Sequence, residues 1–236
     1  MDFHFESDSL VLTGGVDARE YFFPVADLKT IYDYELLAII DDPKSTPRQP
    51  LRHWIVPIKV YLDPKLDSSL KKDFAAFVSI FPAVENLSIE VVTKRENANY
   101  MISYTDENLK PQPSDSTYLG ITYSLMTDLS YKIYGGSLII NPKQIPDIKE
   151  QIRKLRIFFF NSLGQFCILP SRENILFSSK YSPVPFFSEK DATLLRFHYN
   201  FINRHPVTST TFEELFRAYR KLNDLPDGGK VKITLP

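Results

Sequence analysis

Apolar residues alternate with polar ones in the middle of the chain, which is the pattern of half-buried strands. The segment WIVPIKVYLD places Val56, Ile58, Val60 and Leu62 on one face of such a strand. Four shorter segments predict further strands, at residues 87–93, 100–104, 119–125 and 137–140. The YGG sequence just before the last of these segments predicts a turn.

Apolar positions three and four residues apart predict the helices. The first helix after the WIVPIKVYLD strand starts at Ser68 or Ser69 and ends near residue 81. The longest helix covers residues 145–169 and is apolar nearly all round, as a central buried helix is. Further helices are predicted at residues 27–40, from Ser188 onward with Asp191 in a capping-box position, and at residues 211–222. The alternating tail VKITL predicts a last strand.

The order of these elements indicates an α+β fold around one mixed sheet. Residues 1–50 form an N-terminal extension that ends in the Pro-rich linker DDPKSTPRQP. Residues 51–199 hold the predicted sheet and its helices, and residues 200–236 add a C-terminal helix and tail. The sequence therefore predicts one domain between two extensions.

Composition and charge exclude several classes of function. Lys and Arg total 28 against 29 Asp and Glu, which argues against a nucleic-acid partner. No apolar run reaches the roughly 20 residues that cross a bilayer, so no integral membrane segment is predicted. Glycine is scarce, and neither a P-loop nor a dinucleotide-binding glycine motif is present. The single cysteine, Cys167, excludes an intrachain disulfide and is expected to be a small buried hydrophobe.

Three segments carry a resemblance to a known family: NSLGQFCILPS at the end of the long helix, NILF after it, and FFSEKDATLLRFHY further on. In this order they resemble the metzincin metalloproteases, and matrixins in particular. LRHWIVPIKVYL and SLGQFCIL look closer still to an uncharacterised bacterial family of matrixin-like proteins with an eroded zinc motif. The resemblance spans residues 51–199. It implies a mixed five-stranded sheet with a long central helix and C-terminal helices.

The residues that matter for catalysis in metzincins are replaced here. The HExxHxxGxxH motif maps onto Asn161 and Gln165 for the first two imidazoles, Ser162 for the general base, Ile168 for the glycine and Ser171 for the third ligand. Amides are weak oxygen donors, whereas zinc prefers imidazole, thiolate or carboxylate. A serine without a neighbouring base does not take a proton from water. We therefore expect no metzincin-type hydrolysis, no bound metal and no cofactor.

The preferred hypothesis is a non-catalytic metzincin-like domain that binds a protein or peptide through the remnant cleft. In the parent enzymes an extended substrate adds to a sheet edge beside the long helix, a mode that needs no metal. The expected partner-binding residues are Asn161, Ser162, Gln165, Ser171 and Tyr181. Aromatic residues flank the expected cleft and would enlarge such a surface: Tyr118, Tyr123, Tyr131, Tyr134, Tyr181, Phe186 and Phe187.

Two other functions stay open. One is a hydrolase whose site has moved to Glu173, Asp191 or the scattered histidines. The other is a structural accessory subunit that docks on a larger assembly through its extensions, for example through FEELFRAYRKL. A basic set at the start of the long helix could also attract an anion: Lys143, Lys149, Arg153, Lys154 and Arg156. The resembling bacterial proteins favour an extracytoplasmic location, periplasmic or secreted, over a cytoplasmic one.

Overall fold

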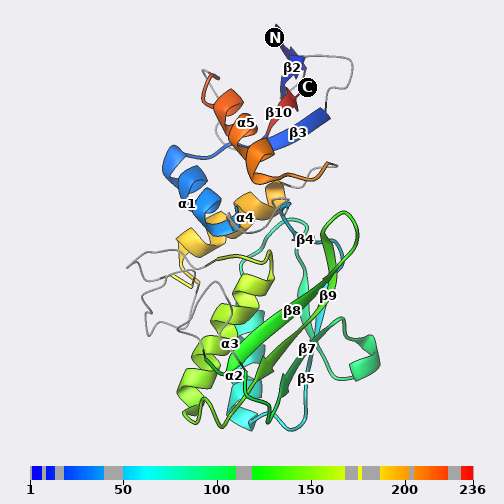
Figure 1. The fold of residues 1–236 in the computed structure, drawn as a ribbon, viewed down its shortest axis with the longest axis vertical. Helices are drawn as coiled ribbons and strands as arrows, with labels where there is room; N and C mark the ends of the chain where they lie inside the picture. The colour runs from blue at the N-terminus through cyan, green and yellow to red at the C-terminus, as the bar shows by residue number, and fades with distance from the viewer. Residues whose placement is uncertain are drawn as a thin grey trace. The chain divides into compact units, whose positions relative to one another are not determined.

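The chain divides into two compact units, one of residues 52–192 and one that joins residues 1–51 to residues 193–236. The computed structural model describes residues 2–6, 9–13, 19–39, 50–109, 119–167, 175–176, 187–201, 205–222 and 230–235, with the backbone alone up to residue 13. Figure 1 shows the elements of both units. Helix α4 (Glu189–Asn200) begins in the first of these units and continues in the second.

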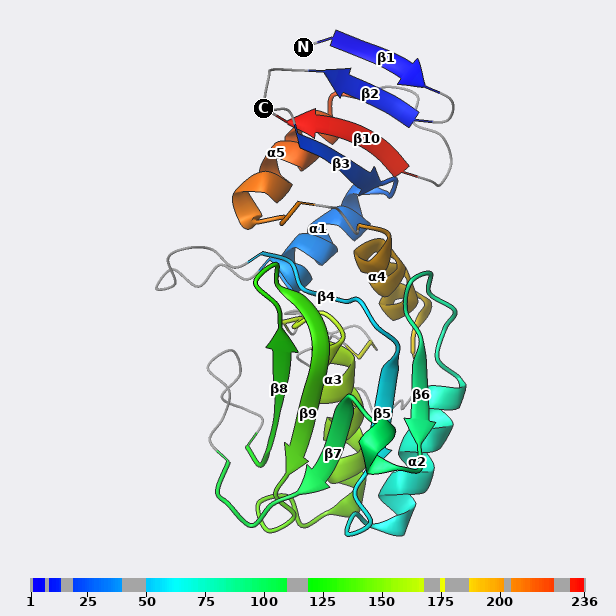
Figure 2. The same cartoon turned by 90° about the vertical axis from the view of Figure 1, so that its right-hand side faces the viewer.

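A mostly parallel sheet forms the framework of residues 52–192. Its strands are β4 (His53–Trp54), β5 (Ile58–Leu62), β6 (Ile89–Val92), β7 (Tyr100–Tyr104), β8 (Ile121–Thr127) and β9 (Lys132–Ile140). Strands β6, β5, β7 and β9 are neighbours in that order and run parallel. The short β4 is parallel to the start of β9, and β8 pairs antiparallel with β9 (Figure 2). A mixed α/β fold is thereby shown.

Two features of the sheet differ from the sequence prediction. The strand predicted around WIVPIKVYLD is divided into β4 and β5 by Pro57, which lacks the N–H that a ladder needs. The YGG sequence does not form a turn, since Gly135 and Gly136 lie inside β9. A side chain at Gly136 would start 2.9 Å from the Ser124 carbonyl oxygen and 3.0 Å from the Tyr100 ring. Close packing, and not a turn, therefore requires this glycine.

Helices α2 (Ser68–Ser79) and α3 (Ile148–Ser162) cover one face of this sheet (Figures 1 and 2). Each begins at an aspartate, because the Asp67 carboxylate accepts from the Ser69 N–H at 2.7 Å and that of Asp147 from the Lys149 N–H at 3.0 Å. The predicted N-cap of α2 was a serine, so the cap lies one residue earlier. A one-turn 3₁₀ helix, η1 (Arg95–Asn97), precedes β7.

The other unit joins both ends of the chain. Strand β1 (Asp2–Glu6) pairs antiparallel with β2 (Ser9–Thr13), and β3 (Arg19–Pro24) pairs antiparallel with β10 (Lys230–Leu235). Helices α1 (Leu28–Ala38), α4 and α5 (Ser209–Tyr219) complete it. The tail strand predicted from VKITL is confirmed as β10, whereas β1, β2 and β3 were not predicted.

Aromatic rings fill the core of this unit. Phe23 on β3 contacts Phe197 of α4 and Tyr219 of α5, with ring centroids 5.8 Å and 4.9 Å apart. Nδ1 of the buried His198 forms a hydrogen bond of 2.8 Å with the Tyr34 hydroxyl. The two segments predicted as separate extensions therefore share one core, and His198 is a hydrogen-bonded core residue.

A buried ion pair joins α2 to α3. Arg156 on α3 is only 7% exposed, and its Nε donates to Asp73 Oδ1 on α2 at 2.9 Å while Nη2 donates to the other oxygen. The same guanidinium lies 5.6 Å from the centre of the Phe77 ring. Because Arg156 is largely desolvated, this two-point contact with the Asp73 carboxylate stabilises its charge.

Replacing Asp73 by Ala is expected to destabilise the protein by about 2–4 kcal/mol, because it takes a bidentate carboxylate away from the buried Arg156 charge. Denaturant unfolding followed by circular dichroism measures the change. The double variant Asp73→Ala with Arg156→Met should recover most of the loss, since it removes both charges. Equal losses in the single and double variants would contradict a buried ion pair.

Candidate functional site

The C-terminal end of α3 carries the residues that the sequence singled out. The helix ends at Ser162 and not at residue 169, so the predicted length is wrong. Gln165 has a positive φ of 55°, and the Phe166 N–H donates to the Asn161 carbonyl at 2.9 Å. This is a Schellman-type cap, in which a left-handed residue stops the helix. Asn161 and Gln165 consequently do not lie one turn apart on a continuous helix.

Ser162 holds the end of α3 to the sheet. Its hydroxyl donates to the Phe159 carbonyl at 2.7 Å and accepts from the Tyr100 hydroxyl on β7 at 3.0 Å. Its own carbonyl accepts from Trp54 Nε1 on β4 at 3.1 Å. Burial raises the pKa of Tyr100, so the phenol stays protonated and remains a donor near neutral pH. Ser162 is fully buried, and in the described part of the chain its hydroxyl bonds a carbonyl and a phenol and not a base, which fits a structural role.

Asn161 and Gln165 carry side-chain oxygens that lack hydrogen-bond donors. Asn161 Oδ1 and Gln165 Oε1 are buried and have no hydrogen-bond partner among the residues that the structure describes, and the whole Asn161 residue is 4% exposed. A buried acceptor without a donor costs about 1–3 kcal/mol. Two such acceptors lie within five residues, and one of them belongs to the left-handed residue Gln165. The end of α3 is therefore less stable than a fully paired helix end would be.

The donor set at the end of α3 does not fit the zinc ion that the metzincin resemblance implies. Two neutral amides and a hydroxyl already engaged in hydrogen bonds are poor ligands for zinc. In the part of the chain that the structure describes, no three His, Cys, Asp or Glu residues lie close enough to hold a metal. Ile168, Ser171 and Tyr181 lie outside the described residues.

The groups offered for a relocated hydrolytic site are occupied where the structure describes them. The buried Asp191 carboxylate accepts from the Ser188 N–H at 2.9 Å and hydroxyl at 2.7 Å, as the capping-box prediction requires. It also accepts from the N–H of Leu176 at 3.1 Å. Burial raises the pKa of the half-buried Cys167 thiol, so little nucleophilic thiolate forms near neutral pH. Glu173 lies outside the described residues.

The basic set of the long helix does not form an open anion site. Four of its five members already contact an oxygen: Lys143 contacts Asp106 at 2.9 Å, Arg153 contacts Glu150, Lys154 donates to the Leu119 carbonyl at 3.0 Å, and Arg156 contacts Asp73. The Lys154 and Arg156 residues are also nearly buried. These contacts with neighbouring oxygens account for the basic residues without a bound anion.

Strand β8 is an edge of the sheet beside α3. It packs against that helix, with the Tyr123 and Phe158 rings 6.2 Å apart, and within the described residues its ladder partner is β9. Leu125 is opposite Gly136, whose N–H points the other way, to the Asn99 carbonyl at 2.9 Å. Leu125 is thus a non-hydrogen-bonded position of the ladder, and its N–H faces away from β9. The sequence predicted this strand but not that it is an edge.

The hairpin between β8 and β9 presents exposed apolar side chains. Leu129 at its tip is fully exposed, and Met126 and Tyr134 on its two strands are each about half exposed. The Asp128 carboxylate accepts from the N–H groups of Ser130 at 2.8 Å and of residue 132 at 2.9 Å, which fixes the turn. Of the predicted cleft aromatics, Tyr134 is exposed, and Tyr123, Tyr131 and Phe187 are half-buried. The other three, Tyr118, Tyr181 and Phe186, lie outside the described residues.

No helix in the described parts of the chain has the length and apolar character needed to cross a membrane. Compared with protein-family models and with curated proteins, the chain matches none. The end of α3 and the strand β8 are therefore the features from which a function can be proposed.

Replacing Asn161 by Leu is expected to stabilise the protein by about 1–2 kcal/mol, because an apolar side chain of similar shape removes the unpaired Oδ1. Denaturant unfolding measures the change. The exposed Asn97→Leu is the matched control, with an effect within about 0.5 kcal/mol. A marked loss of stability in Asn161→Leu would show that the amide makes hydrogen bonds on which the fold depends.

Proposed function

We propose that residues 52–192 form a non-catalytic metzincin-like domain that binds an extended segment of a protein or peptide along β8. The observation that carries this proposal is the position of β8: an antiparallel edge strand beside the helix whose last turn holds Asn161 and Ser162 where a metzincin would hold catalytic groups. Strand addition to such an edge uses main-chain hydrogen bonds and needs neither metal nor base.

The exposed edge of β8 has the chemistry that a bound strand requires. The outward N–H of Leu125 is available as a ladder donor by the alternation of the β8–β9 pair. Met126 and Leu129 add apolar contact area next to this edge, and Tyr134 adds an aromatic surface. Main-chain pairing supplies affinity, while these side chains select among partner residues.

The two unpaired oxygens at the end of α3 give the site a second component. Asn161 Oδ1 and Gln165 Oε1 accept no hydrogen bond, so a donor from a partner would remove an existing cost. Both atoms are buried, and a partner reaches them only by displacing the side chains that cover them. In this proposal the partner first pairs with β8. Hydrogen bonds from the partner to the two amide oxygens then add to the affinity.

A hydrolase with a relocated site has less support. Ser162 is held in two hydrogen bonds with no base beside it, and the Asp191 carboxylate is used to cap α4. The contact between the Ser188 hydroxyl and the Asp191 carboxylate closes a capping box, so it serves the helix start and not a nucleophile. A binding function requires neither, and the geometry favours it.

Leu125→Pro tests strand addition directly, because proline removes the outward N–H and leaves the β9 ladder intact. Peptides selected on the wild-type protein from a random extended library are titrated by fluorescence anisotropy against both proteins. Affinity should fall about tenfold or more in Leu125→Pro, a loss near 1.4 kcal/mol. The matched control Leu125→Ala keeps the N–H and should change affinity by less than about threefold.

Hydrogen exchange supplies the second measurement of the same binding mode. The Leu125 amide should gain protection when peptide is bound to the wild-type protein. Circular dichroism confirms that Leu125→Pro is folded. Unchanged affinity in a folded Leu125→Pro protein, or an equal loss in Leu125→Ala, would contradict strand addition at β8.

A further inference from the structure

Helix α1 has apolar side chains on two opposite faces. Ile31, Tyr34 and Leu37 are buried in the core of their unit. On the other side, three apolar residues four positions apart form an exposed row, the α1 stripe: Leu28, Tyr32 and Leu36, which are 49%, 46% and 59% exposed. A surface helix normally carries polar residues on the face away from the core. A continuous exposed apolar row of this kind marks an interaction surface.

The α1 stripe continues onto α5 through an aromatic contact. The Tyr32 ring meets the Phe216 ring edge-on, with centroids 5.3 Å apart and planes at 90°. A second contact joins α5 to the residues just before α1. The Tyr219 hydroxyl accepts from the Ala26 N–H at 3.2 Å and donates to the Ala26 carbonyl at 2.8 Å. The start of α1 is therefore fixed beside the last turn of α5.

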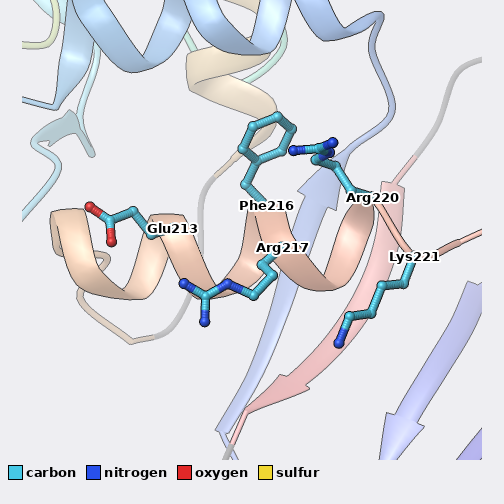
Figure 3. Close-up of a pocket in the computed structure, with 5 residues that line it drawn as sticks. All are labelled: Glu213, Phe216, Arg217, Arg220 and Lys221. Carbon is cyan, nitrogen blue, oxygen red and sulfur yellow. The ribbon is translucent and has the colours of Figure 1, made fainter.

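That last turn carries a cluster of positive charge, the basic trio of Arg217, Arg220 and Lys221. With Glu213 and Phe216 they line a shallow hollow of about 430 Å³ (Figure 3). Arg220 points to the same side of α5 as Phe216, whereas Arg217 and Lys221 point away from that pair. Within the described residues, no member of the trio forms an ion pair with a carboxylate, and all three are exposed.

Helix polarity alone accounts for part of this pattern. Cations near a helix C-terminus interact favourably with its dipole, so one or two basic residues there need no partner. The dipole does not account for an apolar stripe that borders them. On α1 itself the charges beside the stripe are mixed, as in the Lys29–Asp33 pair, and the excess of positive charge lies at the α5 end. Exposed apolar residues with positive charge at one end suit an amphipathic partner that carries acidic residues.

We propose that the α1 stripe binds the apolar face of an amphipathic helix of a partner protein, and that acidic residues beside that face meet the positive hollow around Arg220. The stripe spans about 12 Å, or two helical turns, which matches apolar residues at three- and four-residue spacing on the partner. The uncompensated charge of the trio selects an acidic flank. This surface is separate from the β8 edge and does not depend on the function proposed there.

The probe is a synthetic peptide of about 18 residues, five helical turns, with one leucine face and glutamates on both flanks. A second peptide has lysine in place of every glutamate. Fluorescence anisotropy with the full chain should show saturable binding of the glutamate peptide and binding at least about tenfold weaker for the lysine peptide. Raising the salt from about 0.05 to 0.5 M should weaken the glutamate peptide's binding, since exposed charges are screened.

Two exposed double variants locate the surface. Leu28→Gln with Leu36→Gln and Arg217→Glu with Arg220→Glu should each weaken binding about tenfold or more. Lys72→Glu, an exposed charge reversal on α2, is the matched control and should leave affinity unchanged. Because all of these side chains are exposed, the fold should be retained, which circular dichroism checks.

Three results would overturn the proposal. The first is no saturable binding of the glutamate peptide, or binding that the double variants leave unchanged. The second is binding of the protein to phosphatidylserine vesicles in preference to phosphatidylcholine vesicles. If both double variants abolished that binding, the surface would be a membrane-binding one. The third is a dimer in light scattering that Leu28→Gln with Leu36→Gln converts to a monomer, which would make the occupant a second copy. Leu125→Pro should leave all three readouts unchanged.

Discussion

The hydrogen bonds of Ser162 fix the end of α3 against the sheet. Through its hydroxyl and its carbonyl this residue joins α3 to Tyr100 on β7 and to Trp54 on β4. A buried polar group must be paired, so the three residues constrain one another. Because they do, the last turn of α3 is held in one place, and the positions of Asn161, Gln165 and the neighbouring β8 edge follow from it.

The hydrogen bonds of Ser162 give it a structural role and keep its hydroxyl from taking part in catalysis. Ser162 joins the helix layer to the sheet, and the nearby Asn161 and Gln165 side chains carry oxygens without donors among the described residues. Such unpaired groups persist only where the surroundings over-determine the geometry. The proposed binding function uses what remains, an edge strand and two acceptors. The α1 stripe and the basic trio offer a second surface built from entirely different elements.

Local patterns in the sequence predicted the local elements well. The strand at residues 100–104 matches β7, and the capping box of Ser188 and Asp191 is present as predicted. The failures have non-local causes. Strand β3 exists because residues 230–235 return from the far end of the chain to pair with it, which no window of the sequence reveals. Gly136 was taken for a turn residue, although the Tyr100 ring from another strand is what requires it. The long helix stops early because Gln165, a residue that rarely adopts a positive φ, does so here.

The candidate site was predictable only in part. The sequence located Asn161, Ser162 and Gln165, but burial and hydrogen bonding decide what each one does, and those depend on the packed structure. The edge position of β8 depends on strand order, and the exposure of Leu28, Tyr32 and Leu36 depends on which face of α1 the core takes. Periodicity shows which positions of a helix are apolar. It does not show which of them are buried in the core and which stay exposed.

The central claim is that the end of α3 keeps a metzincin-like framework without its metal chemistry. Zinc content of the protein purified without chelators, measured by plasma mass spectrometry and followed by a zinc titration, tests that claim most directly. The amide and hydroxyl donors at residues 161, 162 and 165 predict zinc near background and no saturable binding. Retention of close to one zinc ion per chain would contradict the account, because it would require a set of ligands that this arrangement does not provide.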